Sequence, residues 1–100
     1  MVKVMYLLKK KQGLSLEDFK SYWLTKHVPI VLKLPNLRRY VVSVSVDERS
    51  EFAGVAELWF ENREEMRAAL KSDVGKEMVS DASNFVESAI MLVLEENIIR

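Results

Sequence analysis

The sequence predicts an α+β fold in which helices cover one face of a single antiparallel four-stranded sheet. Two observations support this fold. Segments with strand and helix patterns follow one another in the order strand, helix, strand, strand, helix, strand, and a capping residue precedes each expected helical region. The chain has 100 residues, enough for one modest hydrophobic core. We therefore expect residues 1–100 to form a single domain.

The first strand and the first helix are predicted from apolar periodicity. Residues 2–9 are apolar on both strand faces, which is typical of a strand buried on both sides. Ser15 is suited to cap a helix, with Asp18 at the third helical position. Three side chains then recur at every fourth position on the expected buried face: Phe19, Trp23 and His27. Pro29 has no N–H group, so this helix is expected to end or kink near it.

The other elements complete the pattern. Residues 40–46 alternate and are rich in valine, which favours a strand. Asn62, followed three residues later by Glu65, is a second capping pair. The further expected elements are strands at residues 37–46, 52–60 and 88–96 and helices at residues 63–71 and about 74–84. The resulting βαββαβ order is that of a ferredoxin-like fold.

The sheet face away from the helices is expected to be apolar as well. Its predicted residues are Met5, Leu7, Val41, Val55, Trp59, Met91 and Val93. A solvated face does not need so many apolar side chains, and a two-fold partner that packs sheet against sheet would bury them. We therefore expect a homodimer.

Composition narrows the classes of partner and cofactor. Fifteen basic and fifteen acidic residues balance, so there is no basic field to attract nucleic acid. The chain has no cysteine and one histidine, which excludes thiolate catalysis and disfavours a metal site. The apolar N-terminal stretch spans only about eight residues, too short for a signal segment or a membrane span. We expect a cytoplasmic protein with no cofactor and no nucleic-acid or membrane partner.

Four sequence segments resemble the EthD family of the dimeric α+β barrel superfamily. They are Y-W-L-T-K-H-V-P-I-V at residues 22–31, L-P-N-L-R-R-Y at 34–40, A-E-L-W-F at 56–60 and D-A-S-N-F at 81–85. The resemblance implies a two-fold dimer whose sheets form a barrel, with a small-molecule pocket between sheet and helices in each protomer. The residues that match family positions are Trp23, His27, Pro29, Tyr40, Glu57, Trp59, Asp81 and Phe85.

The candidate catalytic residues are His27, Tyr40 and Glu57. An imidazole exchanges protons near neutral pH, so His27 is suited to remove a proton next to a carbonyl. The alternative is a structural histidine that bonds carbonyls at the helix end. Tyr40 is suited to polarise a substrate oxygen, or it is a packing residue. Glu57, on an apolar strand, is a second proton carrier or forms an ion pair, with Arg38 or Arg39 or across the dimer.

The expected ligand-binding residues form an apolar wall suited to a ring-containing molecule. They are Tyr6, Trp23, Trp59, Asp81 and Phe85. A simpler role is open to each of them, because aromatic residues commonly pack in cores with any hydroxyl at the rim. Asp81 is placed at the pocket mouth, with helix capping or solvent exposure as the alternative.

The sequence leaves three functions open. The resemblance implies a small cofactor-independent enzyme that transfers protons on a small carbonyl-containing or aromatic metabolite, as an isomerase, cyclase or dehydratase in degradation or biosynthesis. The second function is that of a monooxygenase, either cofactor-free or with haem held by His27 as axial ligand. The third is a non-catalytic or stress-related dimer that binds a small apolar or aromatic ligand. The fold alone does not choose among them.

Overall fold

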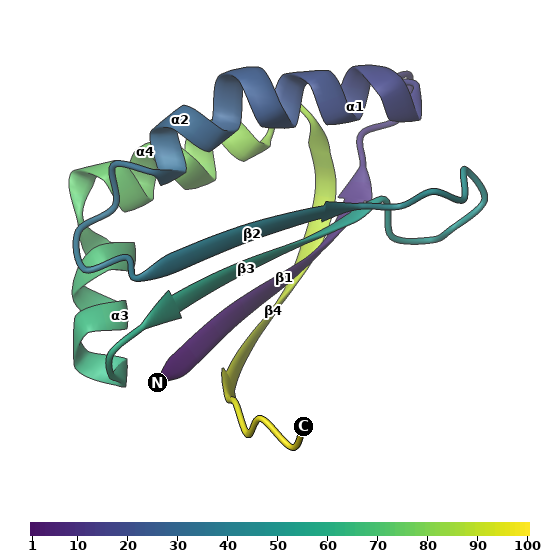
Figure 1. Cartoon of the computed structure of the whole chain (residues 1–100). Helices are drawn as coiled ribbons and strands as arrows, with labels where there is room; N and C mark the ends of the chain where they lie inside the picture. Colours follow the sequence, from purple (N-terminus) through teal and green to yellow (C-terminus); the bar gives the residue numbers. More distant parts are fainter.

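The computed structural model describes residues 1–100 and contains one antiparallel four-stranded sheet (Figure 1). Its strands are β1 (Val2–Lys10), β2 (Arg39–Val44), β3 (Gly54–Phe60) and β4 (Val86–Glu95). Their order across the sheet is β2-β3-β1-β4, with every neighbouring pair antiparallel. The predicted α+β, ferredoxin-like fold is confirmed, and strand ends differ from the prediction by at most two residues.

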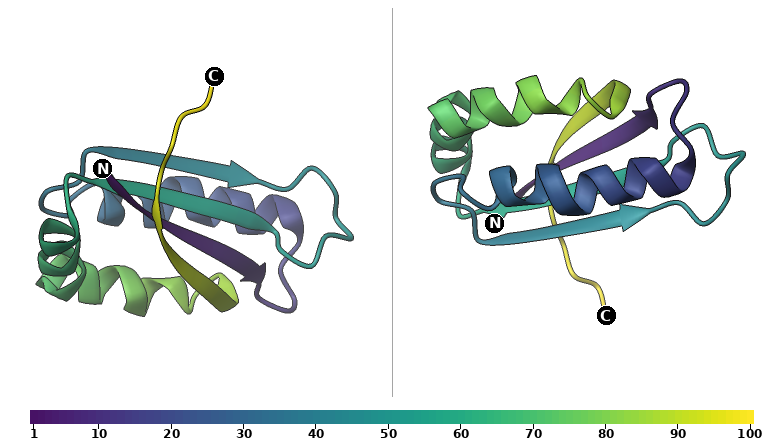
Figure 2. Two further views of the ribbon diagram at one scale, coloured as in Figure 1. Left: turned by 90° about the horizontal axis from the view of Figure 1, so that it is seen from below. Right: turned by 90° about the horizontal axis from the view of Figure 1, so that it is seen from above.

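The helices leave one face of the sheet uncovered (Figures 1 and 2). They are α1 (Leu16–Tyr22), the π-helical turn η1 (Trp23–His27), α2 (Val28–Val31), α3 (Arg63–Lys71) and α4 (Asp73–Ala82). The segment α1-η1-α2 runs across the sheet on the same side as α4, and α3 lies at the end of the sheet. The hydroxyl of Ser15 and the amide oxygen of Asn62 accept N–H bonds three residues on, at 3.0 and 2.8 Å, which confirms both predicted caps. No helix has the length and apolar content needed to cross a membrane.

The first helical segment does not end at Pro29. Instead, the chain widens into the π-helical turn η1 just before the proline, where the N–H of Val28 bonds the carbonyl of Trp23, five residues back. In a regular α-helix the ring of Pro29 would clash with the carbonyl of Thr25. The wider turn stands where an end or a kink of the helix was expected, and the segment continues to Val31.

The core lies between the sheet and the helices and is rich in aromatic side chains. Those with no exposed surface are Phe19, Trp23, Phe60 and Phe85. The Trp23 indole lies directly against the backbone of β3 at Gly54, where an added Cβ would overlap the indole and lie 2.9 Å from the carbonyl oxygen of Ser43. Glycine at this position therefore allows the indole to contact the strand.

The two faces of β4 are the reverse of the prediction. Met91 pairs with Tyr6, and Val93 with Val4, so Met91 and Val93 point to the helix side of the sheet. Ile90 and Leu92 occupy the other face instead. The prediction was wrong because residues 89–94 are all apolar, so no alternation marks the face, and pairing with β1 decides it.

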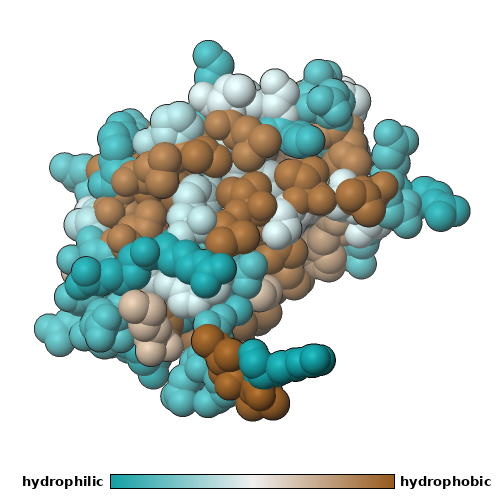
Figure 3. Space-filling model, in the orientation of Figure 1, coloured by the Kyte–Doolittle hydropathy of each residue, from teal (hydrophilic) through white to brown (hydrophobic).

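The face without helices is apolar around a small charged cluster. Ile90 is 48 % exposed and Leu92 is 38 % exposed. Lys3 in the same face bonds Glu57 and Glu96, each at 3.1 Å. Apolar residues gather in the middle of the surface seen in Figure 3, and hydrophilic residues surround them. Water-exposed apolar surface of this kind is suited to association.

Candidate functional site

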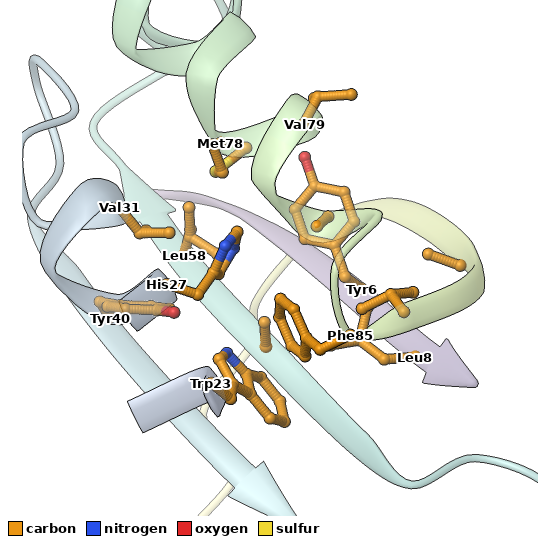
Figure 4. Close-up of a pocket in the computed structure, with 14 residues that line it drawn as sticks. Tyr6, Leu8, Trp23, His27, Val31, Tyr40, Leu58, Met78, Val79 and Phe85 are labelled. Carbon is orange, nitrogen blue, oxygen red and sulfur yellow. The ribbon is translucent and has the colours of Figure 1, made fainter. Parts of the chain in front are cut away.

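A cavity of about 170 Å³ lies between the sheet and the helices (Figure 4). Thirteen of the fourteen residues around it are hydrophobic. They come from every strand and from α1-η1-α2 and α4: Tyr6, Leu8, Trp23, His27, Val31, Tyr40, Ala56, Leu58, Met78, Val79, Ala82, Phe85, Val86 and Ala89. Val79 is 68 % exposed, so the cavity opens to solvent beside α4. Such a lining suits a small apolar molecule.

His27 is the last residue of η1, and its side chain is only 9 % exposed. Its ring packs against Phe85 with 4.9 Å between ring centroids. The Nδ1 atom lies 2.8 Å from Oδ2 of Asp81 on α4, while Nε2 has no hydrogen-bond partner. The only histidine of the chain thus lines the cavity with one nitrogen engaged and the other available. Single π-helical turns are frequent at functional sites.

Asp81 is held by three groups. The hydroxyl of Tyr22 donates to Oδ1 at 2.7 Å, and the amide of Asn84 donates to the same oxygen at 3.2 Å and to the Tyr22 hydroxyl at 2.9 Å. Burial alone would raise the pKa of Asp81, but the hydrogen bonds from Tyr22, His27 and Asn84 outweigh it and lower the pKa from its usual 3.8. Asp81 is therefore an ionised acceptor at neutral pH.

This network assigns the tautomer of His27. An ionised carboxylate only accepts hydrogen bonds, so Nδ1 must carry the proton that it shares with Asp81. In the neutral ring the lone pair is then on Nε2, which has no hydrogen-bond partner. A histidine held in this way is prepared to take a proton from a bound molecule, and the carboxylate stabilises the resulting imidazolium.

Two tyrosines line the cavity. Tyr40, on β2, has a buried hydroxyl with no acceptor for its hydrogen. Burial raises its pKa to about 12, an effect that the neighbouring Trp23 side chain partly offsets. Burial also raises the pKa of Tyr6. Both phenols stay protonated at neutral pH, so each keeps a hydrogen that it can donate.

The family of the chain follows from its sequence. A model of the EthD domain matches residues 11–89. The chain belongs to the EthD family. An uncharacterized 11.0 kDa protein in the thcB-thcC intergenic region of Rhodococcus erythropolis is 29 % identical over 82 residues, covering 78 % of this chain and 79 % of that protein.

Solved structures agree with the EthD assignment. An ethyl tert-butyl ether degradation (EthD) family protein from Bacillus halodurans has a TM-score of 0.84 and 26 % identity, covering 97 % of this chain and 99 % of that chain. A dimeric protein of unknown function from Bacteroides fragilis has a TM-score of 0.74 and 13 % identity, with 95 % of both chains covered. SnoaB, a cofactor-independent oxygenase from Streptomyces nogalater, has a TM-score of 0.70 and 9 % identity, covering 96 % and 92 %. The last two likenesses concern the fold alone.

Two of the candidate site residues of this EthD protein lie on the opposite side of the sheet from the cavity. Glu57 and Trp59 are on the sheet face without helices, because Ala56 and Leu58 take the alternate positions that face the cavity. Glu57 is paired, as the alternative interpretation expected, but with Lys3 rather than with Arg38 or Arg39.

Trp59 contacts cations instead of a ligand pocket. Its ring lies 4.7 Å from the guanidinium of Arg39 and 5.2 Å from the ammonium of Lys3. The strand alternation already grouped Glu57, Trp59 and Val55 on one face, and that face is the one without helices.

The other candidates meet at the cavity or beside it. Trp23, His27, Tyr40, Tyr6 and Phe85 line it, whereas Asp81 does not line it and bonds His27 from behind. The sequence did not reveal that Tyr22 and Asn84 hold the carboxylate of Asp81. The three-residue spacing between Asp81 and Asn84 was the available signal, but the contact with Tyr22 spans 59 residues and has no local signature.

The lining does not suit a metal or haem. No group of three or more acidic, histidine or cysteine side chains is placed to hold a metal ion. A cavity of about 170 Å³ is close to the ~150 Å³ apolar cavity that holds one benzene molecule, and haem is several times larger than benzene. The alternative in which His27 is an axial haem ligand therefore does not fit this cavity.

Proposed function

We propose that this EthD protein is a cofactor-independent enzyme that transfers a proton on a small carbonyl-containing or aromatic metabolite, in an isomerase, cyclase or dehydratase type of reaction. One observation carries the proposal: His27 lines an apolar cavity with no hydrogen bond to Nε2, while Nδ1 is bonded to ionised Asp81 at 2.8 Å. A histidine that served only to cap a helix end would bond backbone carbonyls, and no such bond exists here.

The cavity supports a simple sequence of proton transfers. Nε2 of His27 takes a proton from the carbon next to a carbonyl, and Asp81 stabilises the positive charge that develops on the ring. The electron pair of the broken C–H bond moves to the carbonyl oxygen, where a phenol such as Tyr40 donates a hydrogen bond. Return of the proton to another atom of the substrate completes an isomerisation. The dry lining strengthens each of these electrostatic interactions.

The histidine ring itself offers the test of this proposal. We expect its NMR signals to shift when one class among small lactones, phenols and β-keto compounds is added. Because the chain has one histidine, its ring signals need no further assignment. A ring whose signals respond to none of these compounds would make His27 structural and would favour a non-catalytic binding protein.

We also propose that the protein is a homodimer joined through the sheet face without helices. The exposed Ile90 and Leu92 support this, as does the dimeric state described for the Bacteroides fragilis structure of the same fold. We expect a dimer by sedimentation velocity at micromolar concentration. Leu92→Glu should give monomers, whereas Leu24→Glu, at a similarly exposed leucine on the helix side, should leave the dimer intact. A monomeric unmodified protein would contradict the proposal.

A further inference from the structure

The cavity has a size, a charge and a set of polar groups that together define a narrower ligand class. We infer that it binds an uncharged single-ring compound with one oxygen acceptor, such as an aryl ketone. This inference rests on the proposed function, because it places the substrate in the same cavity, but it concerns recognition rather than chemistry. Each of the three restrictions comes from a separate observation.

Volume restricts the ligand to one ring. The cavity measures about 170 Å³, and an apolar cavity of about 150 Å³ holds one benzene molecule. One six-membered ring with a short substituent therefore fills it. A second fused ring would extend past Val79, which is 68 % exposed at the opening, and would stay partly in water.

Charge restricts the ligand to neutral molecules. The lining contains no lysine, arginine, aspartate or glutamate. His27 alone can become positive there, and Asp81 at 2.8 Å would already compensate that charge. A carboxylate or ammonium that entered the cavity would lose its hydration without gaining an unshared partner, which is strongly unfavourable.

The unpartnered hydroxyl of Tyr40 restricts the ligand to oxygen acceptors. A buried donor without an acceptor is rare and destabilising. Figure 4 shows Tyr40 beside His27 and Trp23, and all three side chains line the cavity. The hydroxyl has almost no accessible surface while the cavity is empty, so a small movement of the Tyr40 ring is needed before a carbonyl oxygen at this corner can accept its hydrogen. A hydrocarbon of the same shape would leave the hydroxyl unbonded.

The two tryptophans provide a reporter and an internal control for binding. Trp23 lines the cavity, whereas Trp59 lies on the opposite face of the sheet. In a nitrogen–proton NMR spectrum of the full chain, acetophenone should shift the indole signal of Trp23 and leave that of Trp59 unchanged. Trp59→Phe assigns the two signals. Benzoate, which has the same ring but a charge, and 2-acetonaphthone, which has two rings, should each bind about tenfold or more weakly.

The role of Tyr40 is tested with a matched pair of ligands. Tyr40→Phe should weaken acetophenone binding by roughly 2- to 10-fold, and it should not weaken the binding of ethylbenzene, which has no acceptor. Failure of acetophenone to bind, equal binding of benzoate or 2-acetonaphthone, or an unchanged acetophenone affinity in Tyr40→Phe would each overturn the inference.

Binding and chemistry fail separately in these experiments. If acetophenone binds as expected but no carbonyl compound exchanges its protons, the ligand class stands and the proposed enzyme does not. If only charged or larger compounds exchange protons, the proposed enzyme stands and the ligand class is wrong.

Discussion

Replacement of His27 by asparagine is expected to lower the rate of carbonyl α-proton exchange by about 10²- to 10⁴-fold. The measurement is the appearance of deuterium next to the carbonyl group of ketones and lactones dissolved in D₂O, followed by NMR. The amide nitrogen of asparagine lies near the position of Nδ1 and can still donate to Asp81, so the network is retained. The substitution removes Nε2 and the neighbouring ring carbon Cε1, and with them the basic nitrogen that has no partner.

Two further variants separate the base from its surroundings. Lys26→Asn also introduces an asparagine, but one residue earlier and on the solvent side of the helix. It should leave the exchange rate unchanged. Asp81→Asn should reduce the rate less than His27→Asn, because an amide oxygen still accepts from Nδ1 but carries no charge to stabilise an imidazolium. Full exchange activity in His27→Asn, with ligand binding intact, would show that another group is the base.

Replacement of Phe85 by alanine is expected to lower the free energy of unfolding by about 3–5 kcal/mol. This ring has no exposed surface and joins the helical segment to the end of α4. Its centroid lies 4.9 Å from that of His27, 5.3 Å from Tyr22 and 5.5 Å from Phe19. Because a domain of this size is commonly stable by only about 5–15 kcal/mol, this one change removes a large share of the total.

Urea denaturation followed by tryptophan fluorescence measures the loss, at one fixed protein concentration because a dimer's stability depends on it. Phe52→Ala is the matched control, since Phe52 is only partly buried and lies outside the core cluster. We expect its loss to be less than half of that at Phe85. Equal losses at the two positions would show that the contacts between Phe85 and the site add no stability of their own.

Local patterns predicted most of the fold, and their limits explain the errors. Capping at Ser15 and Asn62 needs only residues three apart, so both helix starts were visible in the sequence. The π-helical turn before Pro29 could not be seen in the sequence. Its hydrogen bond to the fifth residue back leaves Trp23 and His27 on the same buried face as an α-helix would. The face of Met91 and Val93 depends on pairing with β1, which no property of β4 reveals.

Contacts between residues far apart in the sequence limited the prediction of the candidate site even more than that of the fold. His27 stood out because it is the only histidine on a buried stripe, and the structure places it at the cavity. Asp81 lies 54 residues further along the chain, so its hydrogen bond to His27 could be found only from the fold. The expectation for Glu57 had another basis. A carboxylate on an apolar strand suggested a proton carrier, but Lys3 on the adjacent strand pairs with it.

The contact between Trp23 and Gly54 predicts a pair of residues that can be looked for in homologous sequences. Any side chain at position 54 would displace the indole, and a smaller residue at position 23 would leave a gap beside it. The residues at positions 23 and 54 should therefore change together, rather than singly, among homologous proteins. A homologue that retains both residues inherits this wall of the cavity, while one that has lost both has a cavity of another shape and is a poor guide to the ligand of this protein.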